Sequence, residues 1–147
     1  MGISLQEFSD LTATYNGAIL YQPLSGEIDY NKPLFPINLH PNQMVLPVNT
    51  NENPFAWADK CAEYFKKDIP YVLVPGSNFD IYGTRHGRGG GWYDRFLSKI
   101  PTTWLKIGIT DTSRLSFQQI AKRPWDQTVD WVLACDSGVW NIYKVTP

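Results

Sequence analysis

The segment Tyr71-Val72-Leu73-Val74-Pro75 is an uninterrupted run of β-prone, apolar residues that ends at a proline. A strand with one face in water alternates apolar and polar residues, whereas a continuous apolar run is typical of a strand covered on both faces. We therefore predict that residues 71–75 form a central strand of a sheet with helices on both sides.

Other expected elements alternate along the chain in the same way. Ser4 and Glu7 form a capping-box pattern that predicts a short first helix. Apolar spacing and turn residues predict further helices over 54–67, from Gly91 or Trp92 to near Ile100, and over 116–122. Strands are predicted over 17–21, 44–48, 105–109, 130–134 and 139–145. This order predicts one α/β domain over residues 1–147, three-layer α/β/α with a central mixed, mostly parallel sheet. A ligand crevice is expected at the carboxyl end of residues 71–75.

Charge and composition narrow the class of function. The chain has 13 Lys and Arg against 14 Asp and Glu, a formal net charge of -1. Nonspecific nucleic-acid binding needs a large positive field, so we expect no nucleic-acid partner and an anion held by local contacts. Two cysteines, Cys61 and Cys135, are too few for a zinc tetrad and are expected to be buried thiols. We find neither a signal-peptide pattern nor an 18-residue apolar stretch, and expect a cytoplasmic protein with no membrane contact.

The segment from Arg85 to Phe96, Arg-His-Gly-Arg-Gly-Gly-Gly-Trp-Tyr-Asp-Arg-Phe, lies between a predicted strand and a predicted helix. Glycines let backbone N–H groups approach an anion, and the N-terminus of a helix supplies more of them. The guanidinium groups of Arg85 and Arg88 are suited to phosphate. The pattern favours a phosphate cradle, with a surface loop carrying two solvated arginines as the alternative.

Three residues after the glycines extend this interpretation. Asp94 falls in the first turn of the helix, where it could hold Mg²⁺ beside phosphate oxygens or simply stabilise the helix dipole. Trp92 and Tyr93 could cover a planar ligand or anchor the helix to the sheet. His86 is interpreted as a phosphate neighbour or a solvated residue rather than a general base.

A longer pattern carries a family resemblance. Val74-Pro75-Gly76, Phe79-Asp80 and then Gly83-x-Arg85-x-Gly87-x-Gly89-Gly90-Gly91-Trp92-Tyr93-Asp94-Arg95-Phe96-Leu97 resemble the signature segment of the 5-formyltetrahydrofolate cyclo-ligase family, also called 5,10-methenyltetrahydrofolate synthetase. Weaker similarities include Gly26-Glu27-Ile28-Asp29 and Pro124-x-Asp126. The resemblance covers roughly residues 17 to 135 and implies a NagB/RpiA/CoA transferase-like fold.

The resemblance implies an ATP- and Mg²⁺-dependent enzyme that converts 5-formyltetrahydrofolate to 5,10-methenyltetrahydrofolate, ADP and phosphate. Its partners would be the folate substrate and ATP, and we expect a monomer or weak homodimer. Arg85 and Asp94 would be catalytic, Asp94 and Asp126 would bind the metal, and the folate would contact Glu27, Phe79 and Tyr93. The residues expected to bind ATP or its phosphates are Arg85, Gly87, Arg88, Gly89, Gly90, Gly91, Trp92, Tyr93 and Asp94.

The N-terminal part departs from the family pattern. Family members begin with a Lys- and Arg-rich helix that reaches the ATP phosphates, whereas residues 1–16 contain neither Lys nor Arg. Three hypotheses remain open. The chain could be a compact cyclo-ligase in which Lys32, Lys122 or Arg123 supplies the missing cation, or a noncatalytic nucleotide- or folate-binding module. It could also be another enzyme of small phosphorylated metabolites on this architecture.

Overall fold

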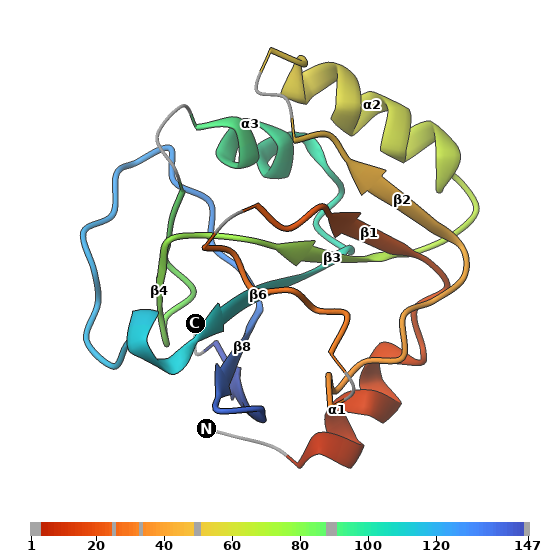
Figure 1. The fold of residues 1–147 in the computed structure, drawn as a ribbon. Helices are drawn as coiled ribbons and strands as arrows, with labels where there is room; N and C mark the ends of the chain where they lie inside the picture. Colours follow the sequence, from red (N-terminus) through yellow and green to blue (C-terminus); the bar gives the residue numbers. More distant parts are fainter. Residues whose placement is uncertain (1–3, 25, 33, 49–50, 88–90, 146–147) are drawn as a thin grey trace.

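The computed structural model describes residues 4–24, 26–32, 34–48, 51–87 and 91–145. Its centre is a six-stranded sheet in the order β2-β1-β3-β6-β8-β9 (Figure 1). All neighbouring strands are parallel except β8 and β9, so the predicted mixed, mostly parallel sheet is confirmed. The strands are β1 (Ala18–Tyr21), β2 (Gln43–Leu46), β3 (Tyr71–Val74), β6 (Leu105–Asp111), β8 (Trp131–Asp136) and β9 (Val139–Lys144).

Strand β3 is central, as its continuous apolar sequence predicts. It pairs with β1 on one side and β6 on the other, and all four of its residues are buried. The carboxyl ends of β1, β2, β3 and β6 therefore point the same way, toward one edge of the sheet.

In the described part of the chain three α-helices pack on this sheet, and the first two begin at side-chain caps. Helix α1 (Leu5–Thr12) starts with the predicted capping box, in which Ser4 Oγ accepts from Glu7 N and Glu7 Oε1 accepts from Ser4 N. Helix α2 (Pro54–Tyr64) is capped by the Asn53 side chain. Helix α3 (Trp92–Lys99) follows Gly91, whose φ of 68° lies in the left-handed region.

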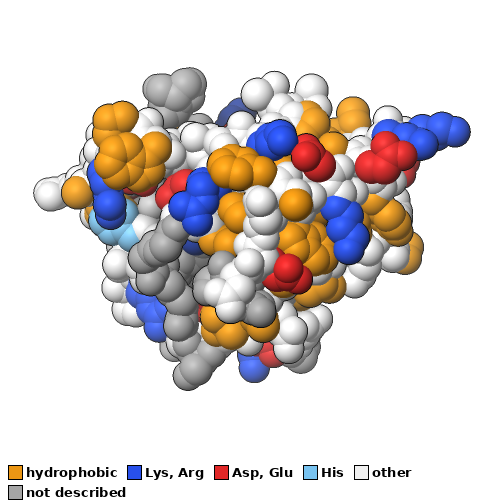
Figure 2. Space-filling view, turned by 90° about the horizontal axis from the view of Figure 1, so that it is seen from above, with side chains coloured by type: hydrophobic (Ala, Val, Ile, Leu, Met, Phe, Trp, Pro, Cys, Tyr) orange, Lys and Arg blue, Asp and Glu red, His pale blue; other side chains and the backbone are white. Residues whose placement is uncertain are grey.

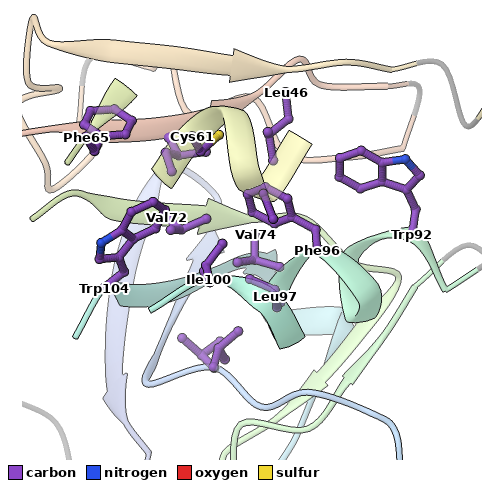
Figure 3. Packing of buried hydrophobic residues seen from close by; sticks show 14 of the residues in the cluster. Leu46, Cys61, Phe65, Val72, Val74, Trp92, Phe96, Leu97, Ile100 and Trp104 are labelled. Carbon is purple, nitrogen blue, oxygen red and sulfur yellow. The ribbon is translucent and has the colours of Figure 1, made fainter. Parts of the chain in front are cut away.

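The helices α2 and α3 lie together over one face of the sheet (Figure 1). Figure 3 shows Cys61 of α2 and Phe96 and Leu97 of α3 directed toward Val72 and Val74 of β3. Burial raises the pKa of the Cys61 thiol to about 12, as expected for a packing thiol, whereas Cys135 is partly exposed.

The opposite face is covered by α1 and by an irregular segment that follows β1. The Phe8 ring of α1 lies 5.2 Å from the Trp131 ring of β8, and Tyr30 and Ile37 of the irregular segment join the same cluster. Cover on both faces gives the predicted three-layer α/β/α arrangement.

The region between Asn78 and Lys122 differs from the prediction. Strands β4 (Asn78–Asp80), β5 (Arg85–His86) and β7 (Leu115–Ser116) form a small second sheet, and a short 3₁₀ helix covers Thr112–Arg114. The predicted helix over 116–122 is wrong. The backbone of this segment is hydrogen-bonded to side chains that are distant in the sequence: Ile120 N donates to Asp80 Oδ2 and Ala121 O accepts from His86.

No helix within the described residues is both long and apolar enough to span a bilayer.

Candidate functional site

A cavity of about 1020 Å³ opens at the carboxyl-end edge of the sheet. One wall follows the ends of β1, β2 and β3, with Gln22, Pro47 and Pro75 among its residues. The others come from β5, the first turns of α3 and residues 121–127. The cavity therefore lies where the crevice was expected, and it is the place to look for the predicted site residues.

Arg85 lies beneath this cavity rather than on an exposed loop. The residue is only 5% exposed, its Nε donates to Pro75 O at 2.5 Å, and its guanidinium carbon lies 5.0 Å from the centre of the Tyr93 ring. A Cβ added to Gly87 would lie 3.0 Å from Arg85 Nη2, so the glycine permits the close approach of backbone and guanidinium.

Among the described residues, carboxylates act on the charge of Arg85 only from beyond ion-pair distance. Desolvation by burial lowers the pKa of Arg85, and nearby Asp94 acts in the opposite direction. An arginine nevertheless stays protonated in proteins. Within the described part of the chain no ion pair within 4 Å includes Arg85. A buried cation without a carboxylate partner favours an anionic ligand in the adjoining cavity.

The two aromatic residues of the motif have different positions. Trp92 also lines the cavity, but it is only 8% exposed, stacks on Phe96 at 5.6 Å and donates from Nε1 to Glu52 O, so it mainly anchors α3. Tyr93 packs against the buried hydrophobic residues on both faces of the sheet, and it lines the cavity. Burial raises the pKa of the Tyr93 hydroxyl, which keeps it neutral and able to donate a hydrogen bond.

Asp94 and Asp126 both line the cavity. Asp94 Oδ1 accepts from Gln127 N at 3.0 Å, and Asp126 Oδ2 accepts from Arg123 N at 2.8 Å. In each carboxylate the hydrogen bonds among the described residues engage one oxygen, and the other can serve a ligand. Two carboxylates together with phosphate oxygens are a typical donor set for Mg²⁺, so these residues fit the metal that the sequence implied. Among the residues described, no group of three or more His, Cys, Asp or Glu could hold a metal by itself.

Glu27 also reaches the cavity, from the turn that follows β1. Its Oε1 accepts from Leu24 N at 2.9 Å, and Arg114 donates to the neighbouring Gly26 carbonyl. These contacts fix the turn beside the carboxylate.

Phe79, predicted to contact the folate, is placed elsewhere. It is 0% exposed and does not line the cavity. Its ring lies against β6, where a Cβ on Gly108 would be 2.4 Å from Phe79 Cε1. Phe79 is therefore a core residue, and it lies opposite Arg85 in the β4–β5 strand pair. Three other predicted phosphate ligands, Arg88, Gly89 and Gly90, lie outside the described residues.

The remaining wall is a segment that we name the strap, residues 117–127. It has no helix or strand and is held by side chains: Asp80 binds Ile120 N, His86 donates to Ala121 O at 2.6 Å, and Asp94 binds Gln127 N. Of the three cations considered from sequence, Lys122 and Arg123 line the cavity and Lys32 does not.

Several cavity residues were not predicted. Pro47 and Val48 directly follow β2, so the rule that ligands bind at carboxyl ends of parallel strands could have identified them. Trp125, 62% exposed beside the Arg123 guanidinium, had no comparable signal because its position depends on the path of the strap.

Figure 2, seen from the side of α2 and α3, shows Lys and Arg interspersed with Asp, Glu and hydrophobic side chains. An anion bound on this side would be held by local contacts rather than by a field of one sign.

Known proteins with related sequences support a common assignment. The family model for the 5-formyltetrahydrofolate cyclo-ligase family matches residues 23–134. The 5-formyltetrahydrofolate cyclo-ligase of Mycoplasma pneumoniae is 27% identical over 118 residues, which are 78% of this chain and 70% of that protein. The protein of the same name from Mycoplasma genitalium is 33% identical over 66 residues, 45% of this chain and 39% of its own length.

Solved structures agree on the fold. The 5,10-methenyltetrahydrofolate synthetase of Mycoplasma pneumoniae has a TM-score of 0.59 at 19% identity, over 87% of this chain and 80% of that one. The NMR structure of the Aquifex aeolicus 5,10-methenyltetrahydrofolate synthetase has a TM-score of 0.60 at 21% identity, over 99% and 86% of the two chains. The extent of the family match, more than half of the residues and all of the cavity-forming region after Gln22, shows that this chain belongs to the 5-formyltetrahydrofolate cyclo-ligase family.

Proposed function

We propose that the protein uses ATP and Mg²⁺ to convert 5-formyltetrahydrofolate to 5,10-methenyltetrahydrofolate, with ADP and phosphate as the other products. The observation that carries the proposal is the buried Arg85, which adjoins a cavity that also contains Asp94 and Asp126. Family membership then selects the reaction among those that use a nucleoside triphosphate.

The phosphate chain of ATP would lie at the N-terminus of α3, above Arg85. The first backbone N–H groups of a helix have no partner within it, so they and the positive end of the dipole favour an anion. Arg85 adds a full positive charge from below, in a part of the cavity where burial reduces screening by water.

Asp94 and Asp126 would hold Mg²⁺ against the phosphate oxygens. When bound, the metal neutralises charge on the β- and γ-phosphates and so favours phosphoryl transfer. The two residues lie on separate segments, the first turn of α3 and the strap, and the hydrogen bond from Gln127 N to Asp94 joins these segments.

The reaction would proceed in two steps. The formyl oxygen attacks the γ-phosphorus and ADP leaves. N10 then attacks the formyl carbon, phosphate leaves with the former formyl oxygen, and the N10 proton is lost. Glu27 would accept hydrogen bonds from N–H groups of the pteridine, and the neutral Tyr93 hydroxyl would donate one to the folate. In this scheme the protein contributes mainly orientation and charge stabilisation.

The test is to mix the protein with ATP, Mg²⁺ and 5-formyltetrahydrofolate and to follow the absorbance of the methenyl product together with ADP. Equal amounts of the two products, formed only when ATP is present, are expected. Nucleotide binding without product would instead support the noncatalytic module. The absence of both binding and product would overturn the proposal.

A further inference from the structure

Basic side chains reach the cavity from two regions of the described chain. Arg85 and Arg95 come from β5 and α3, and Lys122 and Arg123 come from the strap. Helix α1 has no basic residue and packs on the other face of the sheet through Phe8. Among the described residues, the cations that line this cavity therefore come from β5, α3 and the strap.

Lys122 is the strap cation that is available to a ligand. Among the described residues, no hydrogen bond or ion pair includes Lys122 Nζ. The neighbouring Arg123 guanidinium instead lies 5.7 Å from the centre of the Trp125 ring. A lysine with a long, flexible stem can adjust its ammonium group to a phosphate from the rim of the cavity.

The backbone around Lys122 is held on both sides. Before it, Ile120 N donates to Asp80 Oδ2 at 2.9 Å and Ala121 O accepts from His86 Nε2 at 2.6 Å. After it, Arg123 N donates to Asp126 Oδ2 at 2.8 Å. Asp80 is itself 0% exposed and also accepts from Tyr82 N and Thr84 N, so the first anchor is rigid.

The same contacts place Lys122 beside the candidate metal carboxylates. Asp126, whose carboxylate closes the turn that starts at Arg123, lines the cavity with Asp94. These two residues would hold a Mg²⁺ ion, which would neutralise charge on phosphates bound between α3 and the strap. The terminal phosphate would then lie next to the strap, within reach of the residue that precedes the turn.

We propose that Lys122 binds the terminal phosphate of the nucleotide and that His86, through the Ala121 carbonyl, positions the strap for this contact. The inference rests on the proposed function, because it assigns a residue to the same ATP site. It also makes a narrower claim that can be tested without turnover: the cavity has a polyphosphate site to which Lys122 contributes.

The direct test is calorimetric binding of Mg²⁺-tripolyphosphate and of Mg²⁺-ATP to the wild-type chain and to Lys122→Met. Loss of a charge-assisted hydrogen bond should weaken both affinities by about tenfold or more. Lys32→Met is the matched control, since Lys32 is also an exposed lysine but lies outside the cavity, and its affinity should stay within about twofold. Equal affinities of wild type and Lys122→Met would overturn the assignment.

The positioning role is tested with His86→Ala and His86→Gln. Alanine removes the donor to Ala121 O, so the Ile120 amide should exchange faster with deuterium and the KM for ATP should rise more than kcat falls. Glutamine can still donate from its side-chain amide and should restore most of both properties. Unchanged exchange in His86→Ala would refute this role.

The Lys122 assignment and the proposed reaction can be refuted independently of each other. If the wild-type chain binds tripolyphosphate through Lys122 but forms no methenyl product, the Lys122 assignment stands and the proposed reaction is refuted. If product forms and Lys122→Met has wild-type kinetics and binding, the reaction stands and the assignment is overturned. If the wild-type chain binds neither probe, both are overturned.

Discussion

Replacing Asp94 separates the role that the structure shows from the one that we propose, because one carboxylate oxygen binds the strap and the other is proposed to bind a metal. Asp94 Oδ1 accepts from Gln127 N at 3.0 Å, and Asp94 lies in the first turn of α3. Asparagine keeps the oxygen acceptor but loses the negative charge. Alanine loses both.

The expected stability changes follow from these contacts. Loss of the favourable charge at the helix N-terminus should cost about 0.5 kcal/mol in Asp94→Asn. Asp94→Ala should lose a further contribution of about 1 kcal/mol from the hydrogen bond. For a chain of this length, the melting temperatures should fall by about 1–2 °C and about 3–6 °C, respectively.

The activity should respond differently. Both variants remove the charge of the proposed metal ligand, so the rate of methenyl formation should fall by about a hundredfold or more in each. Initial rates measured over a range of Mg²⁺ concentrations, together with thermal unfolding followed by circular dichroism, give both quantities. A wild-type rate and Mg²⁺ dependence in Asp94→Asn would remove Asp94 from the metal site. Equal loss of stability in the two variants would refute the role of the hydrogen bond to the strap.

Three further predictions concern the packing and the charge below the cavity. Gly108→Ala places a Cβ about 2.4 Å from Phe79 Cε1 and should lower the free energy of unfolding by about 1–3 kcal/mol in urea titrations, partly restored by Phe79→Leu; an unchanged midpoint would contradict the packing. Arg85→Met should weaken binding of Mg²⁺-tripolyphosphate by about tenfold or more and reduce its dependence on salt, measured by calorimetry at two ionic strengths, and equal affinity would leave Arg85 a purely structural role. The Cys61 pKa is raised to about 12, so at pH 8 this thiol stays protonated and iodoacetamide should modify Cys135 first; mass spectrometry of the peptides measures both rates, and equal rates would contradict the burial.

The main sheet could be predicted from sequence because its signals are local. The run from Tyr71 to Val74 is apolar at every position, and the capping box of Ser4 and Glu7 lies within four residues. The predicted helix over 116–122 failed because the decisive partners of that backbone, Asp80 and His86, are more than thirty residues away. No pattern within the strap itself reveals them.

The sequence indicated which residue types meet at the cavity but not how they are arranged. The sequence left open a phosphate cradle or a surface loop with solvated arginines, whereas the structure buries Arg85 next to Gly87 and against Tyr93. This burial depends on β4 and β5, which have three and two residues and are too short to show a hydrophobic period. Phe79 was assigned to the folate from the family resemblance, and its place in so short a strand gives no signal of its burial.

The contact between Phe8 and Trp131 has a consequence for synthesis of the chain. Phe8 belongs to the first helix, but its ring partner belongs to β8, near the C-terminal end of the chain. During translation the apolar face of α1 is made long before the strand that completes its packing. A ribosome-bound chain that stops before residue 131 would therefore retain an uncovered apolar helix face, and chaperones that bind such surfaces should associate with it until β8 is added.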